Sequence, residues 1–117
     1  MAPVVAFIPD LLFGSNVVGA LGAAGYETVL VSDGDSLLRE LPGAQVLIVD
    51  LTADADVRID VVTAIPQTGF KTLAFYSHVE ADVRAAAEQA GFDVVVPRSR
   101  MAREGGALVD RLLASDG

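Results

Sequence analysis

The chain has 117 residues, 52% of them hydrophobic, and its 16 acidic against 8 basic side chains give a formal net charge of −8. This length and apolar content suit one domain, residues 1–117, with a buried core. The acidic balance argues against DNA or RNA as a partner, because nucleic-acid binding depends on cationic contacts to phosphate. No apolar run approaches the ~20 residues of a membrane span, and the chain has no cysteine for a disulfide or a thiolate metal site.

The first residues of the chain carry no export signal. Residues 1–3 lead directly into strand-like sequence, without the basic region and cleavage site of a signal peptide. The absence of cysteine is compatible with the cytosol. We therefore expect a cytoplasmic protein without membrane contact.

Short apolar segments alternate with helix-like segments along the whole chain. The predicted strands are 4–8, 27–31, 46–50, 72–76 and 93–96. The predicted helices cover a segment from about 12 or 15 to 24, then 36–41, 57–65, 79–90 and the segment that follows the basic residues 98–103. Short right-handed crossovers between such segments give an open parallel sheet with helices on both faces. We expect an α/β fold: a flavodoxin-like, doubly wound (βα)5 sheet with strand order 2-1-3-4-5.

Local signals indicate where several helices begin and end. Gly25 is the residue type that ends a helix in the left-handed conformation. Ser77 and Glu80 have the S-x-x-E spacing of a capping box, which predicts the start of the fourth helix. Gly105 and Gly106 weaken the last helix by about 1 kcal/mol each, so we expect its first turn to be loose. In the third helix, one apolar face is predicted from Val57, Val61, Val62 and Ile65.

The third predicted strand ends abruptly in a carboxylate. Four apolar residues, Val46–Val49, precede Asp50, and a strand that is apolar on both faces belongs at the centre of a covered parallel sheet. The functional crevice of such a sheet lies at the carboxyl ends of its strands. Asp50 is therefore either a helix cap in the following loop or a functional residue.

These segments resemble the receiver domain of bacterial response regulators over essentially the whole chain. Two features carry the resemblance: the strand Val46–Val49 with its terminal Asp50, and the helix end 85–91 followed by the apolar run 94–96. Three further segments look like those of a divergent, receiver-like group of uncharacterised bacterial proteins: 10–13, 76–79 and 96–99.

The resemblance implies specific roles for the residues near Asp50. A typical receiver, a part of two-component signal transduction, phosphorylates one aspartate with the help of Mg²⁺. Asp50 matches the phosphoacceptor, and Thr52 matches the residue whose carbonyl binds the metal. The acidic pair after the first strand is reduced to Asp10, which has Pro9 beside it. The candidate Mg²⁺ ligands are therefore Asp10, Asp50 and Thr52, and no other cofactor is expected.

Two further positions depart from the receiver pattern. Counting along the chain places Tyr76 where a receiver has Ser or Thr, with Ser77 next to it, and places Arg98 where a receiver has lysine. Ser77 and Arg98 are the candidate phosphate or anion contacts, and a helix cap is the alternative role for Ser77. Lys71 cannot replace Arg98, because it begins the fourth strand ~20 Å from the carboxyl end. The planar fork of arginine is not interchangeable with lysine.

The departures favour a pseudo-receiver over a phosphorylatable receiver. The leading hypothesis is a stand-alone signalling or interaction module that docks a protein partner, without an output domain because the chain ends soon after the fifth helix. One alternative is a phosphorylatable single-domain response regulator that uses Asp50. The other is a flavodoxin-like binder of a small anionic ligand between the loops near Asp10 and the basic segment 98–103.

The sequence gives no reason to expect an enzyme. No general base or nucleophile constellation is present beyond the aspartates. The only histidine, His78, is expected to be an exposed residue in the first turn of its helix. The loop after the first strand also lacks the Ser/Thr/Gly run that a flavin phosphate requires.

Overall fold

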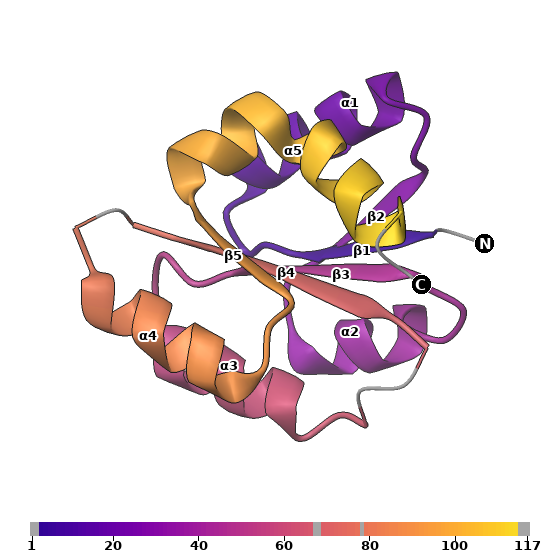
Figure 1. The fold of residues 1–117 in the computed structure, drawn as a ribbon. Coiled ribbons are helices and arrows are strands. Elements are labelled where there is room, and N and C mark those ends of the chain that lie inside the picture. Colours follow the sequence, from indigo (N-terminus) through magenta and orange to yellow (C-terminus); the bar gives the residue numbers. More distant parts are fainter. Residues whose placement is uncertain (1–2, 67–68, 78, 115–117) are drawn as a thin grey trace.

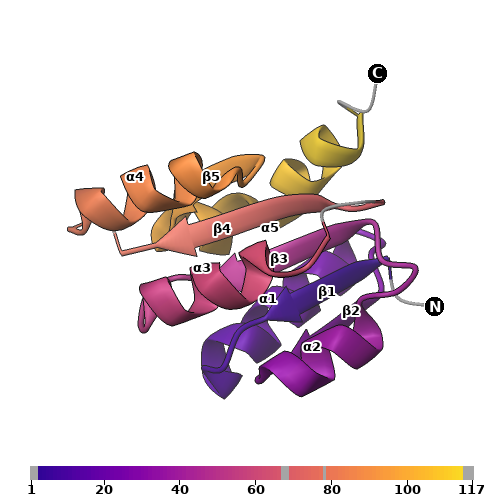
Figure 2. The same ribbon diagram turned by 90° about the horizontal axis from the view of Figure 1, so that it is seen from below.

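The computed structural model describes residues 3–66, 69–77 and 79–114, which form a five-stranded parallel sheet between two layers of helices (Figures 1 and 2). The strands are β1 (Val4–Phe7), β2 (Thr28–Val31), β3 (Val46–Asp50), β4 (Lys71–Tyr76) and β5 (Val94–Pro97). The helices are α1 (Leu11–Ala23), α2 (Gly34–Glu40), α3 (Ala55–Thr63), α4 (Ala81–Ala90) and α5 (Arg98–Ala114). The strand order β2-β1-β3-β4-β5 confirms the predicted flavodoxin-like topology.

Strand β3 occupies the centre of the sheet because both of its faces are apolar. All five of its residues are buried, as expected for a strand that is covered by helices on each side. It pairs with β1 through Phe7 and Val49, and with β4 through Asp50 and Phe75. Asp50 therefore lies at the carboxyl end of the central strand, and its neighbours on both sides are strand ends.

Alternate residues of the strands pack into two separate cores. Figure 1 shows α1 and α5 on one side of the sheet and α2, α3 and α4 on the other. The core under α1 and α5 contains strand residues Val4, Ala6, Val46, Ile48, Leu73, Phe75 and Val96, together with Ile8, which follows β1. The core under α2, α3 and α4 contains strand residues Val5, Phe7, Val31, Leu47, Val49, Ala74 and Tyr76. This period of two fixes which side of the sheet each strand end faces.

The prediction of a common apolar face on α3 was wrong for Val57. Val62 is buried, and Val61 and Ile65 pack against the same core, whereas Val57 is 62% exposed. At 3.6 residues per turn, Val57 points about 90° away from the centre of the face that the other three residues form. Val57 is therefore available on the surface at the start of α3.

Helix α4 begins later than the capping box predicts. Glu80 precedes the helix without a side-chain cap, and its N–H donates to the carbonyl of Ser77 at 2.9 Å. The chain thus forms a turn between these two residues, and the capping-box prediction was wrong. Gly25 adopts the expected left-handed conformation with φ of 95°. His78 lies outside the described residues.

Helix α5 is divided by a kink at Glu104, where φ is −126° and ψ is 17°. The basic residues 98–103, which the sequence placed before the helix, form its first part. The irregularity does lie next to the glycine pair, as predicted, but within the helix and not in its first turn. Beyond the kink, α5 touches α1 closely, because a Cβ added to Gly106 would lie 2.9 Å from the Cβ of Ala24. Only glycine fits there without a shift of the two helices.

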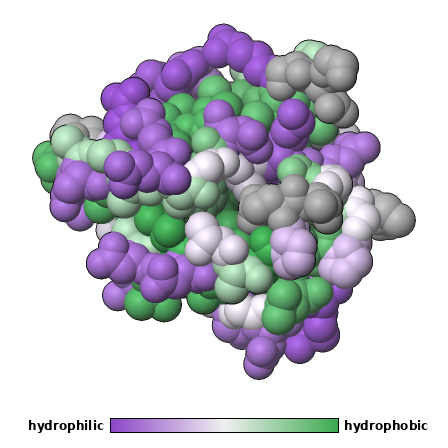
Figure 3. Space-filling view, turned by 60° about the horizontal axis from the view of Figure 1, so that its bottom comes forward, coloured by the Kyte–Doolittle hydropathy of each residue, from purple (hydrophilic) through white to green (hydrophobic). Residues whose placement is uncertain are grey.

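The surface mixes hydrophilic and apolar residues. Figure 3 views the molecule from the side of α2, α3 and α4 and shows hydrophilic side chains interspersed with apolar ones. In the described part of the chain the large exposed apolar residues are Leu11, Leu12, Leu38, Val57 and Val79. Among the described helices, none combines the length and hydrophobicity that a bilayer span requires.

Candidate functional site

The predicted site residues lie at one edge of the sheet, and most of them face the same layer of helices. Near this edge the core under α1 and α5 contains Ile8, which follows β1, and Ile48, Phe75 and Val96 of the next strands. Two residues after each of these, in the same order, come Asp10, Asp50, Ser77 and Arg98. All four lie at the carboxyl edge: Asp50 ends β3, Ser77 follows β4, Asp10 caps α1 and Arg98 begins α5.

A hollow of about 600 Å³ opens at this carboxyl edge. Its lining combines hydroxyl groups, an arginine, a carboxylate and apolar side chains: Phe13, Thr52, Ser77, Glu80, Arg98, Ser99 and Ala102. The structure thus brings together Thr52 from the loop after β3, Ser77 from the loop after β4 and Arg98 from the start of α5. This volume lies in the range of small-ligand pockets.

Asp50 is buried next to this hollow, with only 4% of its surface exposed. Its Oδ1 atom accepts hydrogen bonds from the backbone N–H of Thr52 at 2.8 Å and from the Thr52 hydroxyl at 2.5 Å. The Arg58 guanidinium donates to the backbone carbonyl of Asp50 at 3.1 Å and also to the carbonyl of Ala53. The loop after β3 is therefore held by its own side chains, and one oxygen of Asp50 is already satisfied.

Asp10 serves as the N-cap of α1. Its Oδ1 atom accepts from the N–H groups of Leu12 and Phe13, each at 3.1 Å, which is the usual role of aspartate at a helix start. Its Oδ2 atom lies 3.8 Å from the guanidinium of Arg98, and both side chains are about half exposed, at 51% and 49%. The first acidic residue of the predicted site is thus engaged by a helix and by a cation.

Arg98 also stacks on an aromatic ring that the sequence did not single out. Its guanidinium carbon lies 4.2 Å from the centre of the Phe13 ring, a cation–π contact. Phe13 in turn packs against Phe75 with ring centroids 5.1 Å apart. The contact between Arg98 and Phe13 joins residues far apart in the chain, and no local pattern signals it.

The candidate Mg²⁺ ligands Asp10 and Asp50 are each partly engaged by other groups of the protein. Mg²⁺ requires near-octahedral oxygen ligands, commonly one or two carboxylates with water. Asp10 caps a helix and faces a guanidinium, while Asp50 accepts from Thr52. Within residues 3–66, 69–77 and 79–114, no group of three or more acidic or histidine side chains lies close enough to hold a metal ion.

Ser77, and not Tyr76, faces the hollow. Tyr76 is 5% exposed and belongs to the core under α2, α3 and α4, so its side chain points to the other side of the sheet. Counting along the chain had placed Tyr76 in the hydroxyl position, and the alternation of β4 corrects this by one residue. Ser77 makes no helix cap and lines the hollow instead. Lys71 begins β4 at the opposite edge.

Comparison with solved structures agrees with a receiver-like fold. A response regulator from Thermotoga maritima superposes with a TM-score of 0.81 at 14% sequence identity, covering 98% of this chain and 100% of that chain. A putative pilus assembly-related protein from Burkholderia pseudomallei superposes with a TM-score of 0.78 at 16% identity, covering 97% of this chain and 90% of that chain. No protein-family model matches the chain, and no curated protein matches its sequence. At these identities the likeness shows the fold alone.

Proposed function

We propose that this chain is a receiver-like signalling module that acts through contact with a protein partner, as a pseudo-receiver without catalytic activity of its own. The observation that supports the proposal is that Asp50 and Asp10 are both engaged by other groups of the protein. Asp50 is buried and bonded to Thr52, and Asp10 is committed to the start of α1 and to Arg98. Both groups that a phosphorylatable receiver would use for the metal are thus engaged within the protein.

This engagement opposes phosphoryl transfer to Asp50. Transfer depends almost entirely on positioning the groups and neutralising the developing charge. The buried Asp50 side chain would have to become accessible, and Mg²⁺ would have to displace Arg98 from Asp10. Arg98 itself is held over Phe13. Its planar guanidinium therefore cannot contact a phosphoryl group in the way that the flexible lysine of a receiver does.

Large exposed apolar side chains stand at or just before the starts of three helices along the same edge, which supports a role in protein binding. Leu11 and Leu12, at the start of α1, are 70% and 77% exposed, and Val79, just before α4, is 75% exposed. Val57, at the start of α3, completes the group. Clustered exposed apolar residues mark protein interfaces, whereas single ones are common anywhere. We refer to Leu11, Leu12, Val57 and Val79 as the apolar rim.

Two experiments test the proposal. Acetyl phosphate with Mg²⁺ should give no phosphorylated species by intact mass, under conditions that modify an ordinary receiver run in parallel. A phospho-adduct that disappears in Asp50→Asn would restore the phosphorylatable alternative. This measurement separates the pseudo-receiver proposal from the partner proposal.

The partner proposal is tested by capture from an extract of the source cells with matched variants. Leu12→Ser should lose a bound protein that wild type retains, because it removes an apolar contact from the rim. Leu38→Ser is the control, since Leu38 is exposed on α2 outside the rim. Equal retention by both variants would show that the rim is not the docking surface.

A small anionic ligand is the second candidate. The observation in its favour is the lining of the hollow, where the hydroxyl groups of Ser77 and Ser99 accompany Arg98. Glu80 lines the same hollow and would repel an anion, which is why this candidate comes second. Retention of a small molecule in native mass spectra of the protein purified from its source would favour it.

A further inference from the structure

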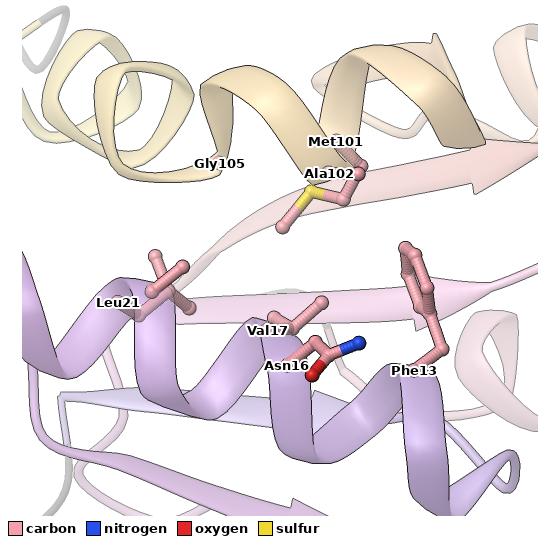
Figure 4. A pocket seen from close by; sticks show the side chains of 8 residues that line it. Phe13, Asn16, Val17, Leu21, Met101, Ala102 and Gly105 are labelled. Atoms are coloured by element: carbon pink, nitrogen blue, oxygen red, sulfur yellow. The ribbon is translucent and has the colours of Figure 1, made fainter.

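A second cleft opens between α1 and α5, next to the hollow. It has a volume of about 190 Å³ and is lined by Phe13, Asn16, Val17, Ala20, Leu21, Met101, Ala102 and Gly105. Figure 4 shows the side chains of Phe13, Val17 and Leu21 extending from α1 toward α5, and Met101 extending from α5 into the space between them. Apart from the Asn16 amide, the side chains around the cleft are apolar.

The cleft exists because α1 and α5 separate on one side of the kink. At Gly106 the two helices are in close contact, because a Cβ added there would lie 2.9 Å from the Cβ of Ala24. Next to the larger Met101, two small residues line the cleft: Ala102, just before the kink in α5, and Ala20 on α1. Gly105 also lacks a side chain, and a Cβ there would lie 3.1 Å from the methyl carbon of Met101. Small residues next to a kink thus leave space that larger side chains would fill.

The cleft is continuous with the hollow at the carboxyl edge. Phe13 and Ala102 line both spaces. Arg98 lies one helical turn before Ala102, and its guanidinium stands over the Phe13 ring at 4.2 Å. Its ion pair with Asp10 is long, at 3.8 Å, and half exposed, so it contributes little stability and a competing anion can replace it. The α1–α5 cleft is therefore an apolar space with the Arg98 guanidinium at its opening.

We propose that the α1–α5 cleft binds a small organic anion with an apolar tail, of the chemical class of short-chain carboxylates. An apolar cavity of about 150 Å³ binds benzene, so this cleft has room for a tail of about six carbons. The carboxylate would meet the guanidinium of Arg98, which suits planar anions. The inference goes beyond the protein-partner proposal and does not depend on it.

The methyl group of Met101 gives a direct measurement. The chain has two methionines, and Met101 is the one in the cleft, so methyl NMR can follow it during titration. Hexanoate should shift the Met101 methyl resonance saturably, with a Kd on the order of 1 mM. Acetate, which lacks the tail, should cause no comparable shift, and hexanol, which lacks the charge, should bind at least about threefold more weakly.

Matched variants decide where the ligand binds. Ala102→Leu fills the cleft and should abolish the Met101 shift, whereas Ala107→Leu, at an exposed position of the same helix outside the cleft, should retain it. Arg98→Gln should weaken hexanoate at least about threefold and leave hexanol unchanged, with Arg103→Gln as the control. Both variants of each pair are checked for wild-type amide spectra.

Each outcome bears on the proposal. Loss of binding in Ala102→Leu and Arg98→Gln, with retention in the two controls, supports it. No saturable shift with hexanoate, or an equal response in Ala102→Leu and Ala107→Leu, overturns the cleft as a site. Equal affinity for hexanol and hexanoate overturns the assignment of an anion as the ligand.

Discussion

The two edges of the sheet carry polar groups of different kinds. At the amino edge, Thr72 is 1% exposed. Its N–H and hydroxyl both donate to Asp93 Oδ2, at 2.8 and 3.2 Å, and its hydroxyl accepts from the Asp93 N–H at 3.0 Å. At the carboxyl edge, Arg98 and Asp10 make one long, half-exposed ion pair. Reciprocal, partly buried hydrogen bonds stabilise a fold more than exposed ion pairs do. Thr72 and Asp93 therefore tie β4 to the residue before β5 at the amino edge. At the carboxyl edge Asp50 is also buried and bonded to Thr52, but the pair of Arg98 and Asp10 stays accessible.

The largest loss of stability is expected from a substitution in the central strand β3, which lies between the two edges. Val49 is fully buried, so Val49→Asp places an unpaired charge in the core and should unfold the domain. Circular dichroism should show loss of the cooperative thermal transition. A melt at the wild-type temperature would contradict the burial of β3 on which the comparison of the edges depends.

The amino edge should be the more sensitive of the two. Thr72→Val leaves the Asp93 N–H without its acceptor and should lower the free energy of unfolding by about 1–3 kcal/mol. The control is Thr63→Val, because the Thr63 hydroxyl is exposed and donates to the carbonyl of Asp60 at 3.2 Å. Urea denaturation measures both. If the two variants lose the same stability, the amino edge has no special role.

The carboxyl edge should respond to loss of a helix cap and not to loss of a charge. Asp10→Ala removes the acceptor for Leu12 and Phe13 and should cost about 1 kcal/mol. Asp10→Asn keeps a cap of similar quality and removes the pairing with Arg98, so its cost should stay below about 0.5 kcal/mol. Equal losses in urea denaturation would mean that the ion pair stabilises the fold.

The smallest effect concerns the start of α2, also at the carboxyl edge. A hydrogen bond from the Ser36 backbone N–H, at 2.8 Å, is the main cause that holds the pKa of Asp33 below its ordinary value of 3.8. A carboxyl group whose pKa is lower in the folded state stabilises the protein above its unfolded pKa, and this contribution is lost as the pH falls through the folded value. Thermal melts should therefore show a slightly steeper acid loss below about pH 4 for wild type than for Asp33→Asn. Asp35→Asn, which leaves the cap in place, serves as the control, and identical profiles for wild type and Asp33→Asn would contradict the role of Asp33.

The sequence predicted the sheet well because its signals are local. The continuous apolar run Val46–Val49 requires burial on both faces, which forces β3 into the centre, and Asp50 follows at the carboxyl edge. The errors also have local causes. The spacing of Ser77 and Glu80 fits a capping box, but an extra turn delays α4. Counting assigned Tyr76 to the hollow, and a shift of one residue moves a strand side chain to the opposite core.

The rest of the candidate site depends on contacts between distant segments. Arg98 and Phe13 meet only because α5 returns beside α1, and the cleft depends on a kink whose direction no pattern of residues specifies. The pairing of Asp10 with Arg98 is likewise set by the folded chain. The residues of the site could thus be predicted from the sequence, whereas the shape of the hollow and of the cleft could not.

The kink at Glu104 also divides α5 into two lengths that differ in their tolerance to substitution. After it, Leu108, Val109 and Leu112 are buried against the sheet, so a polar substitution at any of these three positions should cost core packing. Before it, every residue of 98–103 except Met101 is at least partly exposed. The first length can therefore accept substitutions at most of its positions without loss of the fold, whereas the second cannot at its core positions.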